Sequence, residues 1–135
     1  MRFYLLLLVC FTSLHSCAQK QMKIPTDAVK KLEAFKAKDK FYPDDSVYYP
    51  GLMDSTTKPL FVSLMNAAAD DFKKVVESGT ATEASYHNAI DNAIKRFEPY
   101  FIDTEDRERI GRYFEELMDI VGLQSSGGRI NRFVY

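Results

Sequence analysis

The sequence predicts an all-α protein, a compact bundle of about four helices. Apolar residues recur at helical spacing in the longer segments of the chain. The links between the later helices are only a few residues long, as between antiparallel neighbours. Strand-prone residues are confined to two short stretches. Composition does not shift along the 135 residues, so we expect a single domain.

The N-terminal segment has the features of a signal peptide. Arg2 is followed by an apolar run over residues 3–11, which is shorter than the roughly 20 residues that span a bilayer. Leu14 and Ser16 stand three places and one place before Cys17, as in the lipobox of bacterial lipoproteins. The predicted organisation is a signal peptide over 1–16, a lipid-anchor tether over 17–25 and a single helical domain over 26–135.

This N-terminal pattern predicts an exported protein that is anchored to a membrane by lipid on Cys17 and faces the periplasm or the cell exterior. Cleavage would remove one charge, Arg2, from a chain whose net charge is −1, so the mature protein stays nearly neutral. A neutral chain disfavours nucleic acid, which requires a concentrated basic face. The single remaining Cys excludes an internal disulfide and a Cys-rich zinc site.

The first two helices are predicted over about 26–39 and 59–79. Thr26 suits an N-cap, and Pro59 is favoured in a first helical turn. Gly79 is expected to end the second helix in a left-handed conformation. The apolar stripe of the second helix is broad and consists of Phe61, Leu64, Met65, Ala68, Phe72, Val75 and Val76.

The next two helices follow in quick succession. Thr80 and Glu83 have the spacing of a capping box at the start of the third helix, and Pro99 is expected to stop it. Asp103 is the predicted N-cap of the fourth helix, and Gly122 its left-handed stop. The buried stripe of the fourth helix consists of Ile110, Tyr113, Phe114, Leu117, Met118 and Val121.

Two segments lie outside these four helices. The connection over 40–57 is long for a compact domain and rich in aromatic residues, so it is not expected to be a solvated linker. The tail after Gly128 is β-prone, as are residues 47–49. These two stretches are candidates to pair as a small ribbon over the bundle.

The runs KDKFYP, YYPGL and DTEDRERIGRYFEELMDIVGL resemble a family of small bacterial proteins of unknown function. The resemblance extends from about Leu32 to the end of the chain, and the last run is its most specific part. It implies one compact domain in an exported setting. It implies no activity, cofactor or functional residue.

Two groups of residues suggest an enzyme as the alternative. Acidic residues gather around Asp103–Asp106 and Glu108, as in acid–base or divalent-metal sites. The same residues would complement a helix N-terminus and pair at i,i+4 spacing, for example Glu105 with Arg109. His87 has carboxylates four residues to either side, but this spacing is not a known zinc motif.

No nucleophile and base assemble in the sequence, and we predict no catalytic, metal or cofactor-binding residue. The alternative remains a small envelope hydrolase or metal-dependent enzyme that uses His87 or the Asp103–Asp106 carboxylates. Protein binding is the favoured function, because tyrosine provides contact area at low entropic cost. The predicted interaction surface is Tyr42, Tyr48 and Tyr49 with Arg107 reaching toward the loop, whereas Phe41 is predicted to be buried. The alternative is that the rings of the 40–57 loop only cover the open end of the bundle, and different rings can serve the two roles. At least one of Tyr48 and Tyr49 is predicted to be an exposed recognition residue.

Overall fold

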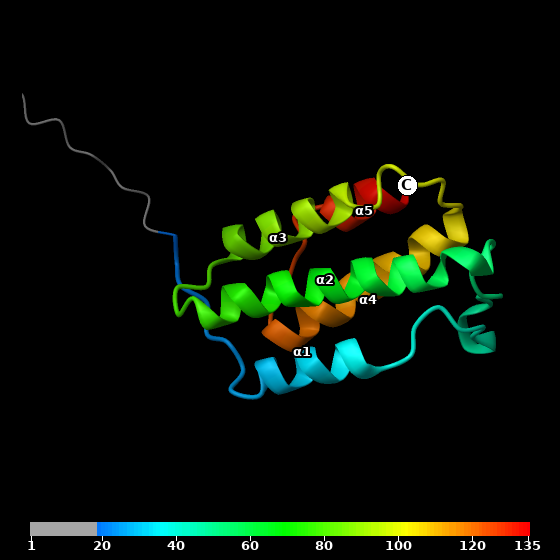
Figure 1. Ribbon diagram of the computed structural model, residues 1–135. Helices are drawn as coiled ribbons and strands as arrows, with labels where there is room; N and C mark the ends of the chain where they lie inside the picture. The colour runs from blue at the N-terminus through cyan, green and yellow to red at the C-terminus, as the bar shows by residue number, and fades with distance from the viewer. Residues whose placement is uncertain (1–18) are drawn as a thin grey trace, which may run out of the picture.

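The computed structural model describes residues 19–135, so Cys17 and the predicted signal peptide lie outside the described residues. The chain forms five α-helices in this range, and two short 3-10 helices lie between the first and second (Figure 1). In chain order these are α1 (Ala28–Ala37), η1 (Asp45–Val47), η2 (Ser55–Thr57), α2 (Lys58–Glu77), α3 (Glu83–Lys95), α4 (Thr104–Val121) and α5 (Arg129–Val134).

The helices form the predicted bundle, with α2 and α4 at its centre. Helix α2 packs against α1, α3 and α4, while α4 packs against α1, α2 and α5. The short α5 lies between α4 and α3. The 40–57 loop lies at one end of the bundle, and the N-terminal segment enters at the other end (Figure 1).

The core is joined by a continuous series of aromatic contacts. Ring centroids of successive pairs are separated by 5.2–6.1 Å in edge or tilted arrangements, which are the favourable geometries for aromatic pairs. The series links α1, α4, the loop, α2, the end of α3 and α5. Its members are Phe35, Tyr113, Phe41, Phe61, Phe97 and Phe133, all of them buried.

Several predicted helix signals are confirmed. Pro59 lies in the first turn of α2, and Gly79 after its end has a φ of +70°. The Asp103 carboxylate accepts the Asp106 N–H at 2.8 Å at the start of α4. Gly122 is left-handed, and the Leu123 N–H bonds back to the Met118 carbonyl at 2.9 Å, so α4 ends in a Schellman motif.

Two predicted caps are wrong by a few residues. The N-cap position of α1 is Asp27 rather than Thr26, without a side-chain hydrogen bond to the first turn, and the helix is shorter than predicted. The capping box of α3 is formed by Thr82 and Ser85 rather than by Thr80 and Glu83. Thr82 is favoured because its backbone is extended by an isolated antiparallel bridge to Gln21, which sets the residue where the helix begins.

The C-terminal tail is helical, so its predicted pairing with residues 47–49 is wrong. Residues 129–134 form α5, and its Ile130 and Phe133 side chains are buried. Their i,i+3 spacing places both side chains on one helical face, which packs on α4 and α3. This tertiary burial overrides the local β propensity of the segment. Within residues 19–135 the only β pairing consists of isolated bridges.

The described part of the predicted tether lies against the bundle. The Met22 N–H donates to the Ala81 carbonyl at 2.8 Å, and the Gln21 side chain donates to the Gly79 carbonyl at 2.6 Å. Met22 and Ile24 pack on the core. The chain is therefore fixed to the bundle from Gln21 onward, at the end where α2 stops and α3 begins.

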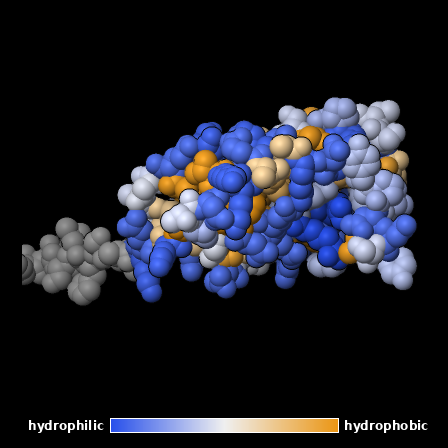
Figure 2. All heavy atoms as spheres, turned by 90° about the horizontal axis from the view of Figure 1, so that it is seen from below, coloured by the Kyte–Doolittle hydropathy of each residue, from blue (hydrophilic) through white to orange (hydrophobic). Residues whose placement is uncertain are grey.

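Polar residues cover most of the face that Figure 2 shows from below. An apolar area lies near the centre of this face, with smaller ones elsewhere on it. No helix in residues 19–135 combines the length and hydropathy that crossing a membrane requires.

Candidate functional site

The 40–57 loop is an ordered structure. Each of its two 3-10 helices begins with an aspartate whose carboxylate accepts a backbone N–H two residues ahead: Asp44 from Ser46 at 3.2 Å, and Asp54 from Thr56 at 2.9 Å. Such side-chain contacts hold a turn without any contribution from a helix or sheet.

Residues 44–49 are closed into a tight unit. Asp44 and Tyr49 exchange backbone hydrogen bonds of 2.7 and 3.0 Å across the turn. The Ser46 hydroxyl also donates to the Asp44 carboxylate at 2.6 Å. This hydroxyl, together with Arg109, holds the pKa of the Asp44 carboxyl below its ordinary value. The unit therefore keeps its shape through charge-assisted contacts.

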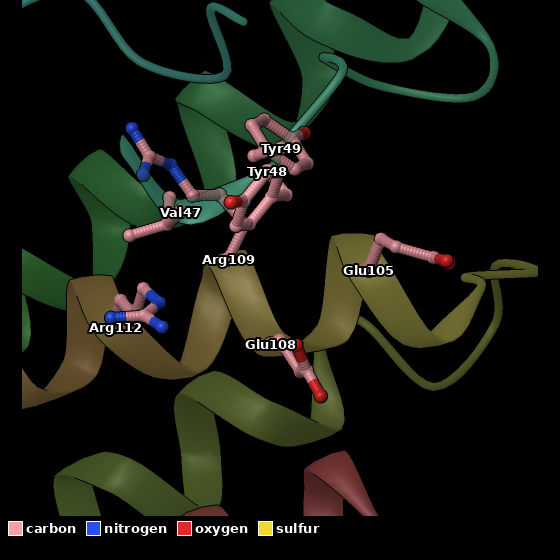
Figure 3. A pocket seen from close by; sticks show the side chains of 7 residues that line it. All are labelled: Val47, Tyr48, Tyr49, Glu105, Glu108, Arg109 and Arg112. Carbon is pink, nitrogen blue, oxygen red and sulfur yellow. The ribbon is translucent and has the colours of Figure 1, made fainter. Parts of the chain in front are cut away.

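Tyr48 projects from the tip of this unit. Its side chain is 93% exposed, and its backbone is left-handed with a φ of +53°. A non-glycine residue in this region costs about 1–3 kcal/mol and persists only where its surroundings impose it. The ring lies over α4 beside Val47 (Figure 3). Of the two tyrosines, Tyr48 is thus the exposed one, and its role in recognition stays a prediction.

Tyr49 points inward and is only 4% exposed, so it does not belong to the surface on which it was predicted. Its hydroxyl donates to Asp106 Oδ1 at 2.8 Å, and the Met53 N–H donates to Asp106 Oδ2 at 3.2 Å. Burial raises the pKa of both Tyr49 and Asp106 above their ordinary values. Tyr48 and Tyr49 are successive residues of the turn, and their side chains point in opposite directions, one outward and one inward.

Arg109, on the face of α4 that the loop covers, holds the loop in place. Its guanidinium donates to Asp44 Oδ2 at 3.0 Å and to the Tyr113 hydroxyl at 3.2 Å. It also lies 5.2 Å from the ring centroids of both Tyr49 and Tyr113, in cation–π range. The predicted surface pair of Glu105 with Arg109 is therefore not formed, because the guanidinium is directed into the loop.

The start of the loop is held by two buried contacts. Lys40 is 1% exposed, and its ammonium donates to the carbonyls of Phe35 and Lys38 at 2.6 and 3.1 Å, where α1 ends. Burial lowers the pKa of Lys40 to about 8. The next residue, Phe41, is buried as predicted, and its N–H donates to the Tyr113 hydroxyl at 2.8 Å.

A hollow of about 270 Å³ lies between the loop and α4 (Figure 3). Residues 105, 108, 109 and 112 recur at i, i+3, i+4 and i+7, so they form one face of the helix and the floor of the hollow. The loop supplies its wall. The lining residues are Val47, Tyr48, Tyr49, Glu105, Glu108, Arg109 and Arg112.

The other two predicted surface residues have different outcomes. Tyr42 is half-exposed, and the Lys58 ammonium lies 3.2 Å from its ring centroid. Arg107 does not reach the loop. Its guanidinium donates to the carbonyls of Ile102 and Phe133 at 3.0 Å each, so it holds α5 instead. Residues two positions apart lie on different faces of an α-helix, so Arg109 faces the loop and Arg107 faces α5.

Exposed apolar side chains gather at the same end of the bundle. Met53 is 66% exposed and Phe101, in the α3–α4 connection, is 87% exposed. Both line a second hollow of about 280 Å³ with Tyr100 and Phe61. Scattered exposed apolar residues are ordinary, but a concentration at one end is typical of an interaction surface. We call residues 42–54 and 100–101, together with the exposed face of α4 from Glu105 to Arg112, the loop end.

The groups of the predicted enzyme alternative are not brought together. The His87 Nε2 atom lies 2.9 Å from the Ser125 carbonyl oxygen, and Asp91 pairs with Arg129 at 2.9 Å. Asp103 caps α4, and Asp106 is buried under the loop. No group of three or more His, Cys, Asp or Glu side chains in residues 19–135 is placed to hold a metal ion.

Sequence reasoning missed Arg109 and the apolar residues Met53 and Phe101. Arg109 has an acidic residue four positions before it, which predicted a local pair. Its actual partner, Asp44, is 65 residues away in the chain, so no local spacing could indicate it. Phe101 follows Pro99 in a short connection, and its exposure is a property of the folded end of the bundle.

Comparison with known proteins places the chain in a family. The family described as "Domain of unknown function (DUF4844)" matches residues 23–135. The fold is also similar to the crystal structure of a DUF3571 family protein from Acinetobacter baumannii AYE, with 34% sequence identity and a TM-score of 0.73 over 80% of this chain and 88% of that one. None of the curated proteins matches the chain. The chain therefore belongs to the DUF4844 family of domains of unknown function, as the resemblance of its fourth-helix run to such a family predicted.

Proposed function

We propose that this protein is an exported, lipid-anchored binding protein of the bacterial cell envelope, and that the loop end of its bundle contacts a protein partner. The observation that carries the proposal is Tyr48: a nearly fully exposed aromatic side chain on a left-handed backbone, within a turn that hydrogen bonds hold from both sides. Because its backbone is held before binding and its side chain has few torsions, Tyr48 would lose little conformational entropy on binding, so it is suited to be an anchor of an interface.

The position of the predicted anchor supports this orientation. The chain is fixed to the bundle at Gln21, only four residues after Cys17. Four extended residues reach at most about 14 Å, so the end near Gly79 would lie close to the membrane. Helix α2 has 20 residues and is about 30 Å long, and it separates that end from the loop end (Figure 1). A lipid on Cys17 would therefore leave Tyr48 directed away from the membrane.

The proposal is tested by crosslinking in cells. The full chain would carry a photoreactive aromatic amino acid in place of Tyr48, or, as the matched control, in place of Lys74, whose side chain is 77% exposed on α2. We expect a discrete protein adduct from position 48 that position 74 does not form. Excess wild-type protein should compete for the adduct, and the Tyr48→Ala variant should not. A position-48 sample without any specific adduct would refute the proposed function.

A further inference from the structure

We infer that the hollow between Tyr48 and α4 receives a basic side chain, Arg or Lys, of a protein partner. This inference rests on the proposed function and specifies the chemistry of the partner. Its first support is the composition of the hollow, which the exposed ring of Tyr48 lines together with Glu105 and Glu108 of α4 (Figure 3). A guanidinium or ammonium group is stabilised both by the face of an aromatic ring and by carboxylates.

The carboxylates of this hollow are available for a ligand. The basic residue four positions after Glu105 is Arg109, whose guanidinium is held by Asp44 and Tyr113. Glu108 contacts the Tyr135 hydroxyl at a long 3.4 Å. Within residues 19–135 neither glutamate has a basic side chain within ion-pair distance. Both are exposed and belong to the residues that line the hollow.

The charge of the whole loop end is complementary to a basic partner. Residues 40–58 and 98–112, which contain the loop end and the residues that flank it, carry eight carboxylates and five basic side chains, a larger negative excess than the net −1 of the entire chain. Four of the five basic groups are engaged within the protein: Lys40 by carbonyls, Lys58 by Tyr42, Arg107 by carbonyls and Arg109 by Asp44. Three of the eight carboxylates are also engaged: Asp44 by Arg109, Asp103 at the start of α4, and Asp106 by Tyr49 and Met53.

The fifth basic group, Arg112, lies at the far side of the hollow beside Val47 (Figure 3). Glu105 therefore lies at one side of the hollow and Arg112 at the other, while Asp44 and Tyr113 hold the guanidinium of the second lining arginine, Arg109. An acidic peptide, a nucleic acid or an anionic membrane would face Asp45, Asp54, Glu105 and Glu108 and be repelled. A basic segment is attracted, and steering by the negative field would accelerate its approach.

The test measures binding of two fluorescent peptides to the full chain in detergent micelles by anisotropy. One peptide alternates Ser with Arg, and the other alternates Ser with Glu. We expect saturable binding of the Arg peptide alone. The Tyr48→Ala variant and the Glu105→Gln, Glu108→Gln double variant should each weaken it by about tenfold or more, which corresponds to about 1.4 kcal/mol. The control is Glu77→Gln with Glu83→Gln, which removes the same charge at the opposite end of the bundle and should change affinity less than about twofold.

All four glutamates are exposed, so we expect their substitution to leave the fold intact. Circular dichroism melting of each variant tests this. Equal weakening in the control variant would show that binding follows net charge rather than the hollow, and would overturn the inference. Failure of the Arg peptide to bind, or equal binding of the Glu peptide, would also overturn it. If position 48 forms a specific adduct in cells but the Arg peptide does not bind, or the Glu peptide binds equally well, the proposed function stands. Only the basic character of the partner is then refuted.

Discussion

The Tyr49 hydroxyl donates a 2.8 Å hydrogen bond to the buried carboxylate of Asp106, and this contact joins the 40–57 loop to the first turn of α4. The same carboxylate accepts the Met53 N–H, so it holds the loop at two points on either side of Pro50 and Gly51. Tyr48, one residue before this anchor, is exposed. Adjacent tyrosines thus have separate roles, one in holding the loop and one on its surface.

This difference predicts opposite effects of substitution at the two positions. Tyr49→Phe removes the hydroxyl and leaves a buried carboxylate with one donor fewer, which we expect to lower the free energy of unfolding by about 1–3 kcal/mol. Tyr48→Phe should leave stability unchanged, because its side chain has few contacts to lose. Urea unfolding of the two variants measures this difference. Equal stability losses would show that the loop is not held by the Tyr49–Asp106 contact.

The Arg109 guanidinium is expected to determine the order of the loop rather than the stability of the bundle. Arg109→Lys cannot contact Asp44 and Tyr113 together in the planar fork that guanidinium provides. We expect amide hydrogens of residues 44–49 to exchange faster while those of α2 and α4 keep their protection. Asp44→Asn should give the same pattern, and the double variant should add little to either single change. Full additivity would contradict a direct coupling of the two residues.

The buried Lys40 predicts an unusual dependence of stability on pH. Its pKa is about 8 in the folded protein, against an ordinary value of 10.5. Between these values the unfolded chain binds more protons, so the contribution of Lys40 to the free energy of unfolding rises with pH. From pH 7 to 9.5 the stability of the wild type relative to Lys40→Met should rise by about 2 kcal/mol. The difference between the free energies of unfolding of the wild type and Lys40→Met cancels the titration of groups that the two proteins share. A difference that is independent of pH would show that Lys40 keeps its proton in the fold.

Gly111 allows α5 to approach α4 closely. A Cβ atom at this position would lie 3.1 Å from Val134 Cγ2 and 3.3 Å from Ile130 Cγ2. Gly111→Leu should therefore destabilise the protein by about 1–3 kcal/mol, although leucine is the better helix former. Hydrogen exchange should show that α5 loses protection first. Glu115→Leu, exposed on the same helix, is the control, and an equal loss there would exclude close packing as the cause.

Lipid attachment at Cys17 remains a prediction, because this residue lies outside the described part of the chain. Cys17→Ala should move the protein from the membrane fraction to the soluble envelope fraction, or leave the signal peptide uncleaved. Fractionation with and without detergent measures the change. Mass spectrometry of the wild type should find the lipid on the N-terminal cysteine. Unchanged, detergent-dependent membrane attachment of the variant would refute lipidation.

The sequence by itself determined the helical class and the positions of α2 and α4, because these depend on local signals. Apolar residues at helical spacing, Pro59 in a first turn, and the Asp103 and Gly122 ends act within a few residues of one another. The burial of Phe41 and the exposure of one of the two adjacent tyrosines were also predictable, because a long aromatic loop buries some rings and exposes others. Which tyrosine is exposed was not predictable.

Only the tertiary structure decided the remaining features, because each depends on residues far apart in the chain. Tail residues with β propensity became α5 because α4 and α3 offered a surface for Ile130 and Phe133. Asp106, which the sequence places among helix-end acids, is buried because Tyr49 and Met53 supply its hydrogen bonds from the loop. Arg109 pairs with Asp44 rather than with the predicted Glu105. A guanidinium that lies beside two aromatic rings is stabilised more than one on a solvated helix face.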